Sequence, residues 1–210
     1  MLEAVASYDL WIWHAFFGVA GANNDLTVLY NSPLFDDLID DIGPQVPFEV
    51  HGRTFKNGYY LADGIYPQWA SFVKSFTVAN NPKHAAWKAK QESARKDIER
   101  AFGVLQGRWH IIAKPARAYT VGKLRRIMYS CIIMHNMILK DQHFQIADAA
   151  ELYIPPTPNI QQTWVERCAT QRRKTKELHD KRTHSRLQLC LIEHVWQQQQ
   201  WEEFQRNNNN

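Results

Sequence analysis

The sequence contains few cysteines and no long apolar run. Its three cysteines, Cys131, Cys168 and Cys190, are odd in number and far apart, which excludes a disulfide framework and the spacing of a zinc site. This pattern favours a reducing compartment. No apolar run reaches the ~18 residues of a membrane span, because Asp9 and His14 interrupt the N-terminal one. That run also lacks the basic start of a secretory signal, so we expect no membrane partner.

Positive charge is scarce in the first part of the chain and concentrated in its middle. Residues 1–81 hold three Lys/Arg against nine Asp/Glu, whereas residues 82–144 hold thirteen against four. Such a block of positive charge usually binds the phosphate backbone of a nucleic acid. A solvated, lysine-rich helical face is the alternative. The distribution favours a polyanionic partner.

A hydrophobic fraction of 45% and eight tryptophans indicate a packed globular protein. The β-prone apolar runs at 2–7 and 10–17 predict a hairpin of buried strands, in which His14 is a packed residue rather than a ligand. Residues 25–42 have helical spacing. Asn24 or Asp25 can cap that helix, and Asp25 could instead be an acid of a functional site.

Two longer segments predict helices. Residues 82–108 form the longest one, and residues 119–141 form a strongly apolar one whose His135 lies in the core. The short run at 109–114 predicts a strand, and residues 67–76 are helical or irregular. The chain therefore has a mixed α/β pattern.

Asp63 stands at the end of a short buried strand, Tyr59 to Ala62, and is followed at once by a turn. Functional side chains gather at the carboxyl ends of strands in open α/β sheets, where the chain leaves the sheet. An aspartate that caps the ADGIYP turn is the alternative.

Glu99 lies on the helix at 82–108 and borders its buried face. It is either a metal ligand or one half of an ion pair with Arg95 or Arg100. Thirty-five residues separate it from Asp63. One acid after a strand and a second on a later helix suggest a divalent-metal site.

The character of the chain changes toward its C-terminus. Residues 145–165 are rich in Pro and Gln and predict a linker or surface loop. Residues 166–204 predict a basic, then amphipathic, helical tail, and residues 205–210 a disordered end. Within the tail, the RRKTK run at 172–176 is either a phosphate contact or a nuclear-import patch.

Several long segments together resemble a plant PIF/Harbinger-type DDE transposase, or a host protein derived from one. The C-terminal LIEHVW is similar to the end of the same family. The resemblance covers nearly the whole chain and rests on DLWIWHAFFGVAGANNDLTVL, NSPLF, YYLADGIYPQW, QESARKDIERAFGVLQGRW and MYSCIIMHNMI.

This resemblance implies a ribonuclease H-like catalytic core in which three acids hold two Mg²⁺ or Mn²⁺ ions during DNA strand cleavage and transfer. Hard oxygen ligands suit these ions, and two ions can clamp both oxygens of an in-line displacement. Asp63 in LADGIYP matches the second acid of the family, and Glu99 in DIERAFGVLQ matches the third. Both are therefore expected to be catalytic and metal-binding.

The first acid of the family has no counterpart in this chain. In the family it precedes the segment that matches residues 2–17, and Glu3, Asp9 and Asp25 fall in the wrong places to replace it. We therefore expect residues 1–144 to form a partial ribonuclease H-like domain without its first strand. Such a sheet would expose two edges, and two carboxylates would hold Mg²⁺ poorly.

The function expected from the resemblance is that of a metal-dependent DNA endonuclease or transposase, inactive or weak in this form, in the nucleus. Arg95, Lys96 and Arg100 are candidates for DNA phosphate contact, or else are solvated helix charges. Transposons of this family usually encode a separate DNA-binding protein, which would choose the target. The alternative is a non-catalytic nuclear module that binds DNA or a protein.

Overall fold

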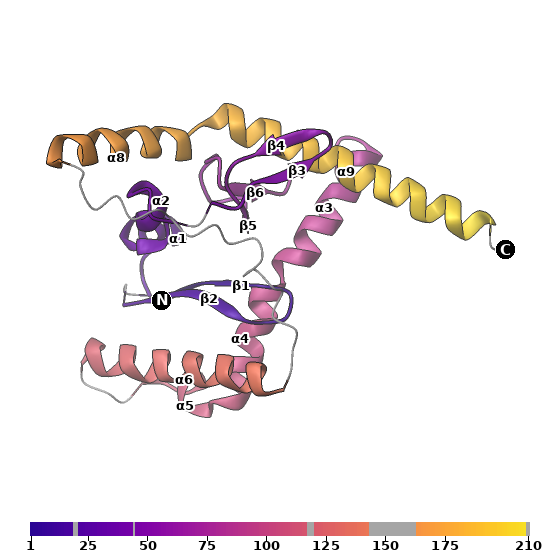
Figure 1. Cartoon of the computed structure of the whole chain (residues 1–210). Coiled ribbons are helices and arrows are strands. Elements are labelled where there is room, and N and C mark those ends of the chain that lie inside the picture. Colours follow the sequence, from indigo (N-terminus) through magenta and orange to yellow (C-terminus); the bar gives the residue numbers. More distant parts are fainter. Residues whose placement is uncertain (19–20, 44, 117–119, 143–162, 209–210) are drawn as a thin grey trace. The chain divides into compact units, whose positions relative to one another are not determined.

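The computed structural model describes residues 1–18, 21–43, 45–116, 120–142 and 163–208 (Figure 1). The chain divides into two compact units. Met1–Leu34 with Arg95–Glu151 form the first unit, and Phe35–Ala94 with Leu152–Asn210 form the second. Both helices and short strands occur, so the fold is mixed α/β, as predicted. No helix in the described ranges is long and apolar enough to cross a membrane.

The first unit is built on an antiparallel hairpin, which confirms the prediction for the N-terminus. Its register runs from Leu2 opposite Phe17 to Ala6 opposite Ile12. The hairpin packs against helices from the middle of the chain around a core that includes Leu105. The elements of this unit are β1 (Leu2–Ala6), β2 (Ile12–Phe17), α1 (Asp25–Asn31), α4 (Asp97–Arg108), α5 (His110–Ala113) and α6 (Val121–Asp141). The 3₁₀ turn η1 (Pro33–Phe35) follows α1.

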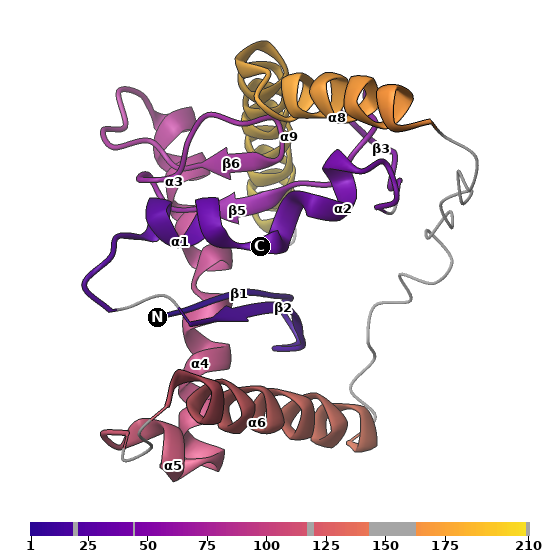
Figure 2. The ribbon, with the colours of Figure 1, turned by 90° about the vertical axis from the view of Figure 1, so that its left-hand side faces the viewer.

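The second unit contains a pair of parallel strands, β5 and β6, which run in the same direction in Figure 2. A second pair, β3 and β4, is antiparallel. Val73 of β6 is fully buried, and its cluster includes Trp87 and Leu187. The elements are α2 (Asp36–Ile39), β3 (Phe48–Val50), β4 (Arg53–Phe55), β5 (Tyr60–Ala62), β6 (Phe72–Lys74), α3 (Pro82–Arg95), α8 (Trp164–Leu178) and α9 (Lys181–Asn208).

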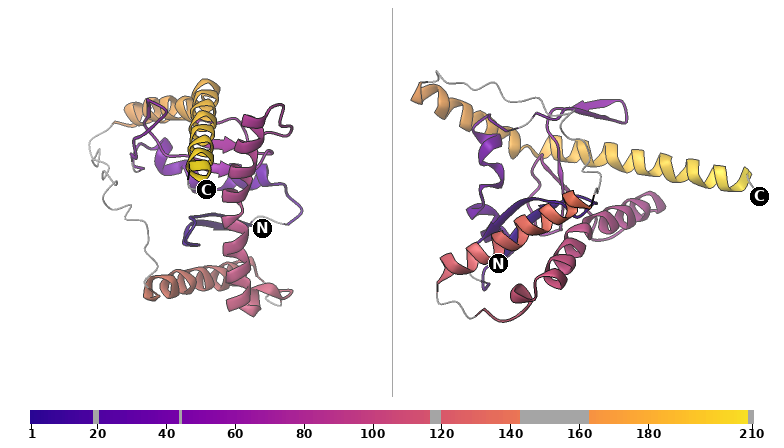
Figure 3. Two further views of the ribbon diagram at one scale, coloured as in Figure 1. Left: turned by 90° about the vertical axis from the view of Figure 1, so that its right-hand side faces the viewer. Right: turned by 60° about the horizontal axis from the view of Figure 1, so that its bottom comes forward.

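The C-terminal helices belong to the second unit. Leu187 and Leu191 of α9 are buried in its core, and α9 packs on β6 and β3. Figure 3 shows α9 as one long helix, described through Asn208 and thus into the stretch expected to be a disordered end. Most of the predicted linker at 145–165 lies outside the described residues.

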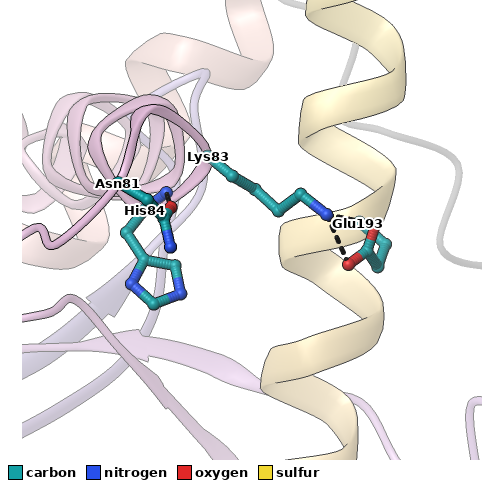
Figure 4. A network of polar contacts seen from close by, with 4 residues as sticks. All are labelled: Asn81, Lys83, His84 and Glu193. Carbon is teal, nitrogen blue, oxygen red and sulfur yellow. Dashed lines mark hydrogen bonds and ion pairs between the residues drawn. The ribbon is translucent and has the colours of Figure 1, made fainter.

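A polar contact links α3 to α9 (Figure 4). Lys83 Nζ lies 2.7 Å and 2.8 Å from the two carboxylate oxygens of Glu193. This hydrogen bond is the main cause that lowers the pKa of Glu193. At the start of α3, Asn81 Oδ1 accepts a hydrogen bond from the backbone N–H of His84 at 2.8 Å. That bond satisfies one of the orphan donors of the first turn.

Three predictions about individual elements are wrong. The helix at 82–108 is two helices that meet at Lys96. Residues 109–114 contain helix α5 instead of a strand, because the run is short and Ile112 N–H bonds to Trp109 O at 3.0 Å within its own turn. Phe72–Lys74 is a strand, whereas the segment was expected to be helical or irregular.

Two neighbouring residues of α6 fix the hairpin of the first unit. Asn136 accepts a hydrogen bond from Ile12 N–H at 3.1 Å and donates one to Ile12 O at 2.8 Å. The fully buried His135 lies 3.0 Å from the carbonyl of Leu10, a residue with a φ of 68°. Its role as a core residue was predicted from the sequence.

The partners of His135 determine its protonation state. Arg108 Nη1, which can only donate, lies 3.2 Å from Nδ1. The carbonyl of Leu10, which can only accept, faces Nε2. The ring is therefore neutral with its proton on Nε2. Burial lowers the pKa of His135 most, the charge of Arg108 lowers it further, and the bond to Leu10 opposes the shift.

Acidification should destabilise the first unit through His135. Because its native pKa is below 6.5, the unfolded chain binds the proton more readily. The stability contribution is complete above pH 6.5 and is lost as the pH falls toward the native pKa. The free energy of unfolding in urea should be higher for wild type than for His135→Gln. This difference should shrink as the pH falls from about 7.5 to about 5.5, by at most ~1.4 kcal/mol per pH unit.

The matched control is His194→Gln at an exposed position of α9. Its stability difference from wild type should not change over the same range. A constant advantage of wild type over His135→Gln would contradict the assignment of a neutral, buried imidazole.

Candidate metal site

Asp63 directly follows β5, at the carboxyl end of the parallel pair. The register pairs Leu61 with Val73 and Ala62 with Lys74, so the strands end side by side. The Asp63 side chain is exposed, and its Oδ1 accepts a hydrogen bond from Gly64 N–H at 2.6 Å. The predicted place of the acid is confirmed. The carboxylate also caps the following turn, as the alternative expected.

Lys74 ends β6 beside this turn. Its Nζ donates to the carbonyls of Gly64 at 3.2 Å and Tyr66 at 2.7 Å. Burial lowers the pKa of Lys74, since desolvation disfavours the charged amine. The lysine therefore holds the loop that carries Asp63.

Gln91 of α3 joins the end of β5 to the middle of β6. It is 2% exposed, and its Nε2 donates to Ala62 O at 3.1 Å and to Val73 O at 3.2 Å. Its Oε1 is buried and has no hydrogen-bond partner among the described residues. Sequence reasoning missed Gln91 and Lys74 because it did not identify β6. The only local signal for β6 in the sequence was its apolar pair followed by a lysine, Phe72–Lys74.

Glu99 lies in the first turn of α4 with a side chain that is 59% exposed. Arg95 Nη1 lies 3.6 Å from its Oε1. The expected position at the border of a buried face is thus wrong, because the buried residues of α4 are Ala101 and Leu105, which lie on the side of the helix opposite Glu99. The ion pair with Arg95 is the alternative that the sequence left open.

The three predicted DNA contacts surround Glu99 in the sequence. Arg95 pairs with Glu99, and Arg100 pairs with Asp97. Lys96 is exposed at the start of α4. One partner of each pair is half-buried, Arg95 in the first and Asp97 in the second.

Asn24, not Asp25, caps α1. Its side chain accepts a hydrogen bond from Thr27 N–H at 2.9 Å, and Asp25 is the first helical residue. At that position the negative carboxylate of Asp25 interacts favourably with the positive end of the helix dipole.

His14 and Glu3 of the hairpin share Ser32 as a partner. His14 is half-buried, with Nε2 3.2 Å from Ser32 Oγ, which fits the predicted packed role. Ser32 also bonds to Glu3, whose pKa is raised chiefly by burial.

The described residues include no group of three or more His, Cys, Asp and Glu side chains that could hold a metal ion. Asp63 belongs to the second unit and Glu99 to the first, and each is described within its own unit. Their carboxylates are oxygen donors of the type that Mg²⁺ and Mn²⁺ prefer. The chemistry of the two donors therefore fits the predicted metal.

The sequence matches the family described as plant transposon protein over residues 1–145. The chain belongs to this family. The match includes Asp63, Glu99 and all three predicted DNA contacts, and it ends before α8 and α9 of this plant transposon protein. Comparisons with curated proteins and with solved structures gave no significant match.

Replacing Gln91 should weaken the strand end that carries Asp63. Gln91→Leu keeps the approximate size of the side chain but leaves the carbonyls of Ala62 and Val73 without their shared donor. We expect the free energy of unfolding to fall by about 1–3 kcal/mol, measured by urea unfolding. Gln200→Leu, at an exposed position of α9, is the control and should stay within ~0.5 kcal/mol of wild type. Equal stability of both variants would refute the role of Gln91.

Proposed function

We propose that this transposon-derived chain is the catalytic part of a Harbinger-type DDE transposase, or a nuclease derived from one, with a ribonuclease H-like core. The observation that carries the proposal is the position of Asp63, directly after a strand of a parallel pair. Functional residues concentrate at that end of α/β sheets. The family match over residues 1–145 supports the transposase origin.

In this proposal, Asp63 and Glu99 are metal ligands. Mg²⁺ or Mn²⁺, when bound, would activate a water and stabilise the leaving oxygen of a DNA phosphodiester. Gly64 N–H and the loop held by Lys74 orient the carboxylate of Asp63. Glu99 must exchange Arg95 for the metal, which is a small cost at an exposed position.

Arg95, Lys96 and Arg100 would contact DNA phosphates near Glu99. Their charge would position the backbone without reading its sequence. We propose further that a separate DNA-binding protein selects the target, and that the protein acts in the nucleus, where its DNA substrate lies.

A second candidate function is a non-catalytic nuclear module that binds DNA or a protein. The ion pair of Arg95 with Glu99 and the cap of Asp63 on Gly64 N–H favour it. Both acids then have structural partners and need no metal. DNA cleavage distinguishes the two functions, because the module would bind DNA without nicking it.

Calorimetric titration with Mn²⁺ tests the proposed ligands. Wild type should bind Mn²⁺ weakly, and Asp63→Asn or Glu99→Gln should each lower the affinity at least tenfold, which is about 1.4 kcal/mol. Glu203→Gln, on an exposed part of α9, removes the same charge and should have no such effect.

Unchanged affinity in both single variants would refute the ligand assignment. Plasmid nicking that needs Mg²⁺ and disappears in Asp63→Asn would favour the nuclease over the module.

A further inference from the structure

Helix α8 carries a run of basic residues whose charges fall on different sides of the helix. On one side, Lys174 Nζ lies 2.5 Å and Arg173 Nη2 3.7 Å from carboxylate oxygens of Asp41. Gln171 of the same helix donates to Asp40 at 2.6 Å. These contacts fix α8 near the end of α2 and neutralise part of the run.

Other basic side chains lie together on a neighbouring side of the helix. Arg172, Lys176 and His179 are all exposed and line one groove with Cys168, Gln171 and Thr175. Their spacing of four and three residues places them on one face of the helix. Within the described chain, no ion pair of Arg172 or Lys176 is observed. Two like charges one turn apart repel each other, and an anionic partner would relieve this repulsion.

We propose that this α8 basic face, formed by Arg172, Lys176 and His179, binds the phosphate backbone of duplex DNA. DNA presents closely spaced phosphates along each strand, and Arg and Lys side chains one helical turn apart can reach neighbouring phosphates. Such contacts position a protein on DNA without reading its sequence.

The α8 basic face is rigid before DNA arrives. Thr163 and Glu166 form a capping box at the start of α8. At the other end, the carbonyl of the buried Leu178 accepts from Ala70 N–H at 2.7 Å, and the ring of His179 packs on Trp69 with centroids 4.4 Å apart. Little conformational freedom is therefore lost on binding.

DNA fits this surface better than a nuclear-import receptor does. A receptor that reads a basic peptide in extended form would require α8 to unfold. It would also have to break the contacts of Arg173 and Lys174 with Asp41. Duplex DNA can contact the exposed side chains while the helix stays intact.

DNA binding at the α8 basic face goes beyond the proposed function and does not depend on the proposed metal ligands. Helix α8 lies outside the family match at residues 1–145. The α8 basic face uses neither Asp63 nor Glu99, so DNA binding can be measured in EDTA. Loss of the metal site would leave the result unchanged.

The salt dependence of DNA affinity tests the proposal. Fluorescence anisotropy with a mixed-sequence duplex, in EDTA, would compare wild type with Arg172→Gln/Lys176→Gln. Removal of two phosphate contacts should lower the slope of log affinity against log salt by about 1.8. When the salt is raised from about 50 to 200 mM, the Gln pair should therefore lose roughly tenfold less affinity than wild type loses.

Arg53→Gln/Lys56→Gln is the matched control, because it removes two exposed positive charges from the same unit. Its slope should equal that of wild type. The charge-preserving pair Arg172→Lys/Lys176→Arg should also keep the wild-type slope. An unchanged slope in the Gln pair, or an equal change in the control, would overturn the proposal. If the Gln pair lost nuclear import but kept the wild-type slope of DNA affinity against salt, the α8 basic face would bind an import receptor. That result would also overturn the proposal.

Cys168 provides a second readout that needs no substitution. It is half-buried in the same groove, whereas Cys131 and Cys190 are buried. Duplex DNA should slow the alkylation of Cys168 several-fold at low salt, and high salt should restore the rate. A rate that is insensitive to DNA would contradict binding at this face even if the Gln pair did not fold.

Discussion

Strands of three residues leave their ends short of hydrogen-bond partners, and side chains of the surrounding helices supply them. Gln91 donates to Ala62, the last residue of β5, and to Val73, the middle residue of β6. Gln188 of α9 donates to Lys74 O at 3.0 Å, and His184 Nδ1 lies 2.8 Å from Phe72 O. Buried backbone groups must be paired, so these helix side chains stabilise the pair β5 and β6. The position of Asp63 depends on this arrangement.

The hairpin of the first unit follows the same rule. Its strands are longer, but the turn and the start of β2 are held by His135 and Asn136, and Arg125 Nε donates to Phe17 O at 3.0 Å. In both units, the side chains that bond to the backbone of the strands are thus polar and lie on helices, many residues away in the sequence. They supply specificity of packing that the apolar clusters alone would not give.

The sequence predicted the elements with strong local signals. The apolar run at 10–17, the strand before Asp63 and the buried His135 agree with the structure. The break at Lys96 and the strand Phe72–Lys74 could not be predicted, since three residues show no periodicity and the parallel partner is distant in sequence. The pairing of Glu99 with Arg95 was one of two open alternatives, and only the geometry of the helices could decide it.

Paramagnetic broadening of backbone amide NMR signals by Mn²⁺ tests directly whether Asp63 and Glu99 bind a divalent metal. If they do, the signals of Gly64 and Arg100 should broaden at the lowest metal concentrations. The acids at 36–41 form the competing site, because four aspartates cluster there in the sequence. Broadening that begins at residues 36–41 and spares Gly64 and Arg100 would show that neither acid is a metal ligand.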